Sequence, residues 1–441
     1  MTASSSHPDT IVAPATALAR SALAIVRIDG PLSATIITSL TGILPEERYA
    51  THIALKSGGE LLDDCIVLRY VAPRSFTGND MVELMLHGSP FLVDRVIGAI
   101  VALGARVAEP GEFTERAVLN GKIDLLQAES IADLIDARTA VQAKLSLRNL
   151  EGVLSRKASE TREALLHVIS RLEAALDFSE EGYEFITRED ARARVEAARD
   201  DVRMVAATFE RGRATATGLS AVILGRPNAG KSTLLNRLVG SERAIVTAQP
   251  GTTRDIVRET IDIGGLPVTI ADTAGLRATR DEVEEIGIAR AKAAARSADL
   301  VLYLVDASAG VAAEDHLEEF PDALIVYTKS DIARAPAGEL AISAATGAGV
   351  DELLSRLDSL VRERFAAPES SPAIVNERQR AAVAECEAAL DAALASLAEG
   401  AEEQYVVVDL YRAANALGIL TGAITREDVF REIFSKFCIG K

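Results

Sequence analysis

The chain has 441 residues, enough for two or three domains that each bury a core of their own. Its 47 basic and 65 acidic residues give a net charge of −18, which argues against indiscriminate binding to nucleic acid or to anionic membranes. The cysteines Cys65, Cys386 and Cys438 are odd in number and widely spaced, so we expect no disulfide framework and a reducing, cytoplasmic location.

The first 120 residues predict a small α+β domain. The apolar run from 11 to 28 is interrupted by Arg20 and Arg27, so it predicts neither a signal peptide nor a membrane span. Glu83 and His87 stand in a segment that alternates with apolar residues, which favours a strand with one solvated face. The predicted elements are strands at 24–28 and 65–71, a helix at 91–103, and turns at Gly58-Gly59, Pro73 and Gly78-Asn79.

The chain from Leu125 to about residue 215 is rich in Ala, Leu, Glu and Arg and predicts helices. Leu165, Ile169, Leu172 and Leu176 recur at spacings of four, three and four, which places them on one face of an amphipathic helix. Beyond that helix we expect a break at 177–187, a second helix at 188–211 and a linker at 215–218.

Residues 216–366 alternate strand and helix patterns and predict an α/β layer with helices on both faces. A linker at 367–372 leads to helical residues 376–441. Because an amphipathic tail cannot bury its apolar stripe alone, we expect it to pack on the helices before residue 216, with the α/β domain inserted between them. The elements predicted inside the α/β domain are a strand at 220–224, a helix at 233–238, a hairpin at 259–270 and buried central strands at 300–305 and 323–327.

The α/β domain begins with Gly225–Ser232, which fits the phosphate-loop pattern G-x-x-x-x-G-K-[ST]. Glycines let backbone N–H groups approach phosphate oxygens, and the following helix directs its positive end at the same anion. We expect Lys231 to contact the β- and γ-phosphates and Ser232 to bind Mg²⁺. A glycine-containing turn before a helix is the alternative, but the flanking strand and helix patterns favour the phosphate loop.

Later motifs favour GTP over ATP. Asp331, in Thr328-Lys329-Ser330-Asp331, can accept both N1–H and N2–H of guanine, a donor pair that adenine lacks. We expect Asp272 to hold Mg²⁺ through water, Gly275 to sense the γ-phosphate and Thr253 to close over both as a switch loop does. The predicted GTP-binding residues are Asn228, Ala229, Gly230, Lys231, Ser232, Thr233, Thr247, Ala248, Gln249, Pro250, Gly251, Thr252, Thr253, Asp272, Thr273, Ala274, Gly275, Thr328, Lys329, Asp331, Ser343, Ala344 and Ala345.

These motifs resemble the TRAFAC GTPase superfamily and, more closely, its tRNA-modification GTPase family called MnmE or TrmE. The resemblance covers nearly the whole chain and is carried by Ser75–Gly78, Glu109–Arg116, Leu119–Asp124, Gly225–Ser232, Gly251–Asp255, Asp272–Arg277 and Phe437–Lys441. It implies a multidomain α/β protein: an α+β N-terminal folate-binding and dimerisation domain at 1–120, a discontinuous α-helical domain at 121–215 and 367–441, and an inserted Ras-like P-loop GTPase domain at 216–366.

The resemblance also implies an activity. Members of the family hydrolyse GTP and, with an FAD-containing partner of the MnmG (GidA) type, add a carboxymethylaminomethyl or aminomethyl group to C5 of the wobble uridine in certain tRNAs. It implies a heterotetramer with that partner, a homodimer through the N-terminal domain, transient pairing of the GTPase domains and no membrane. The N-terminal domain is implied to bind a tetrahydrofolate one-carbon derivative (5-formyl or 5,10-methylene), and GTP hydrolysis to drive conformational change.

Individual residues match the family's assigned positions. These are Asn228, Thr247, Gln249 and Thr252 for K⁺; Ser232 and Thr253 for Mg²⁺; Glu284, Arg277 and Cys438 for catalysis; and Arg27, Glu83, Lys122 and Lys441 for folate. A K⁺ ion beside the phosphates places positive charge where an arginine finger would, and such fingers contribute roughly 10³ to 10⁵ in rate. Composition alone leaves alternatives open: Asn228 as a turn residue, Glu284 in a solvated helix start and Cys438 as a buried structural thiol.

Thr328 departs from the family pattern, which has Asn there. The change predicts loss of an amide that bridges to the phosphate loop, with weaker GTP binding, while Asp331 keeps the guanine selectivity. Two other classes of function stay open. One is a regulatory or ribosome-assembly GTPase that binds rRNA; the other is a membrane-transport GTPase with the same K⁺ chemistry, which the lack of a predicted spanning segment disfavours.

Overall fold

The computed structural model describes residues 9–178, 185–241, 243–245, 258–272, 293–311, 319–365, 373–424, 427–435, 437 and 439–440. The chain divides into two compact units, one made of residues 1–132, 155–163 and 414–441 and the other of 133–154 and 164–413. Across the described residues, no helix combines the length and the apolar character needed to cross a membrane.

The first unit is built on a six-stranded sheet with the order β3-β4-β5-β2-β1-β6 among the described residues. Neighbouring strands are antiparallel except β1 and β6, which are parallel. The predicted strands at 24–28 and 65–71 are confirmed, although the second begins earlier, at Glu60, and Gly58-Gly59 forms the turn of a hairpin. The strands are β1 (Ile11–Pro14), β2 (Leu23–Asp29), β3 (Thr51–Ser57), β4 (Glu60–Tyr70), β5 (Met81–His87) and β6 (Arg106–Val107).

One face of this sheet packs against α1 (Ser33–Thr41) and α2 (Pro90–Ala102), which confirms the predicted helix at 91–103. Val82, Leu84 and Leu86 of β5 share a buried core with residues of both helices. Because side chains alternate along a strand, Glu83 lies on the opposite face of the sheet. Alternation therefore separates the apolar core from the polar side chains that form the cavity described below.

A buried ion-pair network joins α3 (Glu112–Leu119) to the sheet. Arg116 is fully buried and donates to Glu112 at 2.9 Å and to Asp29 at 3.0 Å. Asp29, also fully buried, accepts hydrogen bonds from the Thr77 hydroxyl and the Asn79 amide. Each carboxylate has a cationic or polar partner, which offsets the cost of removing these charges from water. The network thereby holds the loop that carries Thr77 in a fixed position.

The chain returns to this unit near its C-terminal end. α14 (Glu427–Ser435) and Phe437 share a small core with α4 (Leu125–Asp136). Gly111 has a φ of 73°, and a Cβ atom there would lie 2.6 Å from the Phe434 carbonyl oxygen. Ile439 forms a β-bridge with Pro110. The last described residues therefore pack against the segment that precedes α3.

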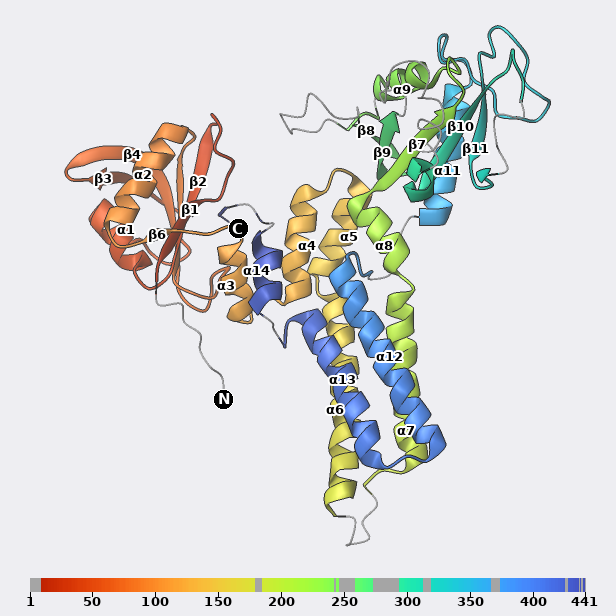
Figure 1. The fold of residues 1–441 in the computed structure, drawn as a ribbon. Coiled ribbons are helices and arrows are strands. Elements are labelled where there is room, and N and C mark those ends of the chain that lie inside the picture. The colour runs from red at the N-terminus through yellow and green to blue at the C-terminus, as the bar shows by residue number, and fades with distance from the viewer. Residues whose placement is uncertain are drawn as a thin grey trace. The chain divides into compact units, whose positions relative to one another are not determined.

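The helices of the second unit confirm the helical prediction for residues on both sides of the α/β region. α7 and α12 lie side by side (Figure 1). Arg203 of α7 forms ion pairs with Glu387 at 2.7 Å and with Asp391 at 3.0 Å, both on α12. Leu165, Ile169 and Leu172 are buried as predicted, but Leu176, in the last turn of its helix, is exposed. The helices that lie wholly or partly in this unit are α5 (Ala140–Leu150), α6 (Val153–Asp177), α7 (Arg188–Ala206), α8 (Phe209–Thr217), α12 (Glu377–Glu399) and α13 (Glu403–Thr421).

The prediction of a single helix at 188–211 was wrong, because α7 ends at Ala206 and α8 begins at Phe209. The Thr208 hydroxyl donates to the Val205 carbonyl and accepts the Ile374 backbone N–H, so a distant segment crosses the chain at the break. The predicted linker at 215–218 was also wrong. Its first three residues belong to α8, since Ala214 packs into the core of the neighbouring sheet and only Gly218 ends the helix.

The second unit also contains a five-stranded sheet with the order β11-β10-β7-β9-β8 among the described residues. All neighbours are parallel except the predicted hairpin of β8 and β9, which is confirmed. α9 (Lys231–Val239) and α11 (Val350–Phe365) cover one face, and the helical segment that contains Ala295 packs on the other. The strands are β7 (Leu219–Gly225), β8 (Arg258–Ile263), β9 (Leu266–Asp272), β10 (Leu300–Asp306) and β11 (Leu324–Thr328).

The run at 323–327 was predicted to be a central strand, but β11 stands last in the strand order. Its outer side is nevertheless covered. The Tyr327 N–H donates to the Leu340 carbonyl and the Ile342 N–H donates to the Tyr327 carbonyl, both at 2.8 Å. A single β-bridge between Tyr327 and Ala341, rather than a further strand, covers this edge of the sheet. This cover accounts for the apolar sequence of β11.

Asp299 joins α8 to the amino ends of β7 and β10. Its carboxylate accepts the Ser220 backbone N–H and hydroxyl, each at 2.8 Å, and a hydrogen bond from Arg213 at 3.1 Å. Burial raises the pKa of Asp299, but these hydrogen bonds and the charge of Arg213 outweigh it and hold the pKa below the ordinary value of 3.8. The ionised form therefore stabilises the folded chain.

We predict that Asp299→Asn lowers the free energy of unfolding by about 1 to 3 kcal/mol near pH 7, because it removes a charged acceptor of three hydrogen bonds. A lowered folded pKa contributes stability above the unfolded pKa and loses it as the pH falls through the folded value. The difference between the two proteins should therefore shrink below about pH 3.8. Urea unfolding across pH measures this, with the exposed Asp322→Asn as the control; equal stability at pH 7 would contradict it.

Candidate nucleotide site and N-terminal cavity

The phosphate-loop residues connect the carboxyl end of β7 to the start of α9. Gly225 approaches β10 so closely that a Cβ atom there would lie 2.4 Å from the Leu304 carbonyl oxygen. Asn228 and Gly230 have φ values of 63° and 94°, in the left-handed region, and α9 begins at Lys231. The loop thus turns tightly into a helix N-terminus, where the helix dipole and the backbone N–H groups favour an anion.

The Lys231 side chain bends back over the loop. Its Nζ donates to the carbonyl oxygens of Gly225 at 2.7 Å and of Arg226 at 2.8 Å. An ammonium in this position adds a positive charge to the N–H groups at the start of α9. The residues present therefore fit a bound phosphate chain. The strand before the loop and the helix after it confirm the local arrangement that the motif predicted.

Thr328 contacts the phosphate loop, although the replacement of the family's Asn by Thr was expected to remove this contact. Its side chain is 1% exposed, and its hydroxyl donates to the Ala229 carbonyl of the phosphate loop at 2.8 Å. The Val305 carbonyl lies 3.3 Å from the same hydroxyl. The predicted loss of a bridge was therefore wrong, because a hydroxyl at this buried position reaches the loop directly.

The segments expected to recognise the base lie next to each other. The Ser330 N–H donates to the Ile342 carbonyl at 3.1 Å, which places 328–331 beside 343–345. Lys329, with a φ of 58°, forms an ion pair with Asp306 at 2.6 Å. Asp331 is exposed, and its carboxylate forms no hydrogen bond with another described residue. Its two oxygens are thus available to a pair of donors such as the guanine edge offers.

Arg237 of α9 supports the second of these segments. Its guanidinium donates to the Ala344 carbonyl at 3.3 Å and to the Ala345 carbonyl at 2.9 Å. These hydrogen bonds occupy the carbonyl side of residues 344–345. The arrangement is compatible with the predicted use of backbone N–H groups in this segment.

On the N-terminal sheet, a second polar site gathers around Glu83. Arg27 donates to one Glu83 oxygen at 3.0 Å and 2.8 Å, and the Tyr70 hydroxyl donates to the other at 3.1 Å. Burial raises the pKa of Tyr70, and the charge of Glu83 and this hydrogen bond raise it further. His87 lies at the end of the same strand, where its Nδ1 is 2.7 Å from Asp63.

Glu83 and Tyr70 line a cavity of about 440 Å³. Arg27, which pairs with Glu83, is not among the lining residues, and its guanidinium lies over the rings of Phe76 and Phe113 at 5.5 Å and 5.6 Å. The other lining residues are Arg48, Arg74, Ser75, Phe76, Met81 and Lys122. A carboxylate, an aromatic wall and several cations suit a planar heterocycle that carries N–H donors and an anionic substituent.

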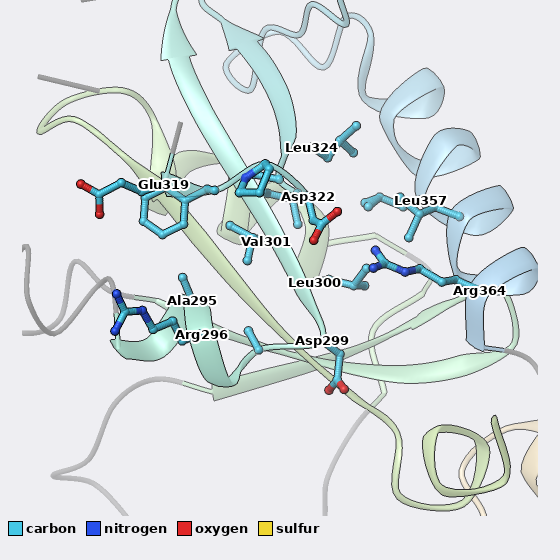
Figure 2. A pocket seen from close by; sticks show the side chains of 16 residues that line it. Ala295, Arg296, Asp299, Leu300, Val301, Glu319, Asp322, Leu324, Leu357 and Arg364 are labelled. Atoms are coloured by element: carbon cyan, nitrogen blue, oxygen red, sulfur yellow. The ribbon is translucent and has the colours of Figure 1, made fainter. Parts of the chain in front are cut away.

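A third feature, a cavity of about 280 Å³, lies in the α/β region (Figure 2). Leu300 and Leu324, which begin β10 and β11, line it together with Leu357 and Arg364 of α11. The phosphate loop follows the carboxyl end of β7, and β7, β10 and β11 are parallel. This cavity therefore lies at the opposite, amino ends of the strands. It is not the nucleotide site.

Two family models match the chain. The model described as the MnmE helical domain matches residues 125–438, and the model described as the GTP-binding protein TrmE N-terminus matches residues 10–122. Proteins named tRNA modification GTPase MnmE are similar over nearly their full length. Those from Koribacter versatilis and Paramagnetospirillum magneticum are 40% and 42% identical, and each alignment covers 98% of this chain and 99% and 100% of the relative.

The chain belongs to the MnmE family of tRNA modification GTPases. The relative from Rhodospirillum rubrum, 41% identical over 98% of the chain, carries the same name. The family resemblance drawn from the motifs is therefore confirmed over nearly the whole chain.

Several residues matched to MnmE positions lie outside the described residues. They are Thr247, Ala248, Gln249, Pro250, Gly251, Thr252, Thr253, Thr273, Ala274, Gly275, Arg277, Glu284, Cys438 and Lys441, together with the side chain of Asp272. Their assignments stay predictions. The linker predicted at 367–372 also lies there.

Sequence analysis missed Tyr70, Arg48 and Arg74, because each lies in a segment whose pattern is that of an ordinary strand or turn. Phe76 lies in the Ser75–Gly78 motif that contributed to the MnmE resemblance, so that motif was the available signal. Tyr70 reaches Glu83 only when β4 and β5 pair, and a hydrogen bond from the Arg48 N–H to the Arg69 carbonyl brings Arg48 beside β4.

We predict that Thr328→Val weakens GTP binding about three- to tenfold, because the phosphate loop loses a buried hydrogen bond of roughly 0.5–1.5 kcal/mol. Thr328→Ser, which keeps the hydroxyl, should bind nearly as tightly as the unsubstituted chain. Equilibrium titration with a fluorescent GTP analogue measures both, and unchanged affinity in Thr328→Val would show that the bridge does not support the loop.

Proposed function

We propose that this chain binds and hydrolyses GTP at the phosphate loop and uses the hydrolysis cycle in the modification of tRNA. The observation that carries the proposal is the loop after β7, with Lys231 over it and Thr328 tethering it. Membership of a family whose members are named tRNA modification GTPases supports the same reading. GTP rather than ATP is supported by the exposed carboxylate of Asp331 beside residues 343–345.

Within this proposal the chain's residues have distinct tasks. The loop N–H groups and Lys231 hold and polarise the phosphates, and Asp331 selects guanine. Ser232 and Thr253 would hold Mg²⁺, while Asn228, Thr247, Gln249 and Thr252 would hold K⁺; these ions would supply positive charge beside the β- and γ-phosphates. Glu284 is proposed to orient the attacking water, and Arg277 and Cys438 are the further catalytic candidates.

We further propose that the chain acts with an FAD-containing partner of the MnmG type on C5 of the wobble uridine, as the family resemblance implies. The N-terminal cavity is proposed to bind a tetrahydrofolate one-carbon derivative. Glu83 fits this role, since it is only 14% exposed and can accept N–H donors from a pterin, and Lys122 and Lys441 would hold anionic groups. A homodimer through the N-terminal domain and a GTPase domain inserted in a discontinuous helical domain complete the proposal.

A regulatory or ribosome-assembly GTPase is the alternative. The N-terminal cavity favours tRNA modification, because an assembly GTPase has no evident use for a carboxylate-and-aromatic pocket. We predict that tRNA from cells lacking this protein has unmodified C5 at the wobble uridine of some tRNAs, and that the intact gene restores the modification. Nucleoside analysis by mass spectrometry measures this. Unchanged wobble uridines would favour the alternative.

We predict that K⁺ accelerates GTP turnover over Na⁺ at equal ionic strength, by up to the roughly 10³-fold of a weak arginine finger, and that Asn228→Gly abolishes the difference. Glycine adopts the left-handed conformation of residue 228 freely, so this variant removes the side-chain oxygen while keeping the turn.

Asn228→Ala serves as the matched comparison, because it removes the same oxygen and also strains the backbone. If Asn228 is only a turn residue, Asn228→Gly will keep the K⁺ acceleration and Asn228→Ala alone will be impaired. Loss in both variants supports the K⁺ ligand.

A further inference from the structure

The mouth of the N-terminal cavity is positively charged, although the chain as a whole has a net charge of −18. Arg48, Arg74 and Lys122 line the cavity, and Glu83 is the carboxylate among its described lining residues. Glu83 is already paired with Arg27, so it does not balance the positive charges of the three cations. We call Arg48, Arg74 and Lys122 the cationic rim.

Arg48 is the least committed of the three. Its side chain is exposed, and no hydrogen bond or ion pair joins its guanidinium to another described residue. Its backbone has a φ of 58°, which residues other than glycine rarely adopt. The Arg48 N–H donates to the Arg69 carbonyl at 2.8 Å, and Glu47 forms a bridge with Arg69, so β4 holds this conformation in place. Residues held in this way cluster at ligand clamps.

The other two cations can also contact a ligand. Arg74 pairs with Glu47 at 3.0 Å, but its side chain is 66% exposed, and exposed ion pairs of this kind are weak and readily exchanged. Lys122 donates to the Pro73 carbonyl at 2.9 Å, which leaves its ammonium group further donors. The cationic rim therefore offers three groups that can each bind a carboxylate.

We infer that the cationic rim binds the carboxylates of an oligoglutamate tail, so that the cavity prefers a polyglutamylated tetrahydrofolate to the monoglutamyl form. The inference rests on the proposed folate function. A cavity of about 440 Å³ accommodates the ring system, with its N–H edge toward Glu83, and directs the tail to the mouth. Each γ-linked glutamate adds one carboxylate, and arginine guanidinium groups match carboxylates with two parallel hydrogen bonds.

The experiment is equilibrium binding of mono- and pentaglutamyl 5-formyltetrahydrofolate to the full-length chain. We expect the pentaglutamyl form to bind roughly fivefold or more tightly, and the preference to fall as salt increases. In Arg48→Asn with Arg74→Gln the preference should fall at least about threefold, because only Lys122 of the cationic rim remains, with pentaglutamyl binding weakened more than monoglutamyl binding. Asparagine tolerates the left-handed conformation of residue 48, so this variant tests charge rather than backbone strain.

Arg95→Gln is the control, since it removes one positive charge from α2, outside the cavity lining, and should keep the preference. Equal affinity for the two forms in the unsubstituted chain would overturn the inference and leave folate binding standing. A preference that persists undiminished in the double variant would also overturn it, because neither arginine of the cationic rim would then contribute to binding the tail. Binding of neither form would overturn the folate proposal itself, and the inference with it.

Discussion

The nucleotide-binding region depends on the parallel pairing of β7 with β10 and of β10 with β11. In this register Gly225 lies opposite Leu304, and Asp306 lies opposite Thr328. The segments that follow β7 and β11 therefore both begin at the carboxyl ends of the parallel strands. The hydrogen bond from Thr328 to Ala229 then becomes possible across 99 residues of sequence. Shifting either strand by one residue would reverse its side chains and remove this contact.

The N-terminal cavity depends on a different constraint, the alternation of side chains along β2 and β5. Apolar residues face α1 and α2, while Arg27 and Glu83 meet on the other face as directly paired neighbours. The loop that carries Phe76 is held by hydrogen bonds from Thr77 and Asn79 to Asp29, which Arg116 pairs. Buried ion pairs contribute little net stability, so the effect of this network is to fix one position for the cavity wall.

Local sequence patterns predicted the structure correctly where a short segment determines its own backbone conformation. The phosphate loop, the hairpin at Gly264-Gly265 and the amphipathic helix through Leu172 were all predicted correctly, because glycine positions and periodic apolar residues express backbone geometry directly. Errors arose where another part of the chain intervenes. The predicted helix at 188–211 is divided at Thr208, whose hydroxyl accepts the Ile374 N–H. The helix α8 continues through 215–217, because Ala214 packs into the core of the sheet.

The sequence by itself determined the family and the phosphate-loop motif and predicted the guanine-selective segment, since these depend on residue types at fixed spacing. Only the tertiary structure decided that Thr328 replaces the expected amide bridge, that Asp299 joins α8 to the sheet, and that Tyr70 and the cationic rim surround Glu83. The physical reason is common to all three. Each depends on side chains from separate segments, and their distances are set by strand pairing and packing that no local pattern contains.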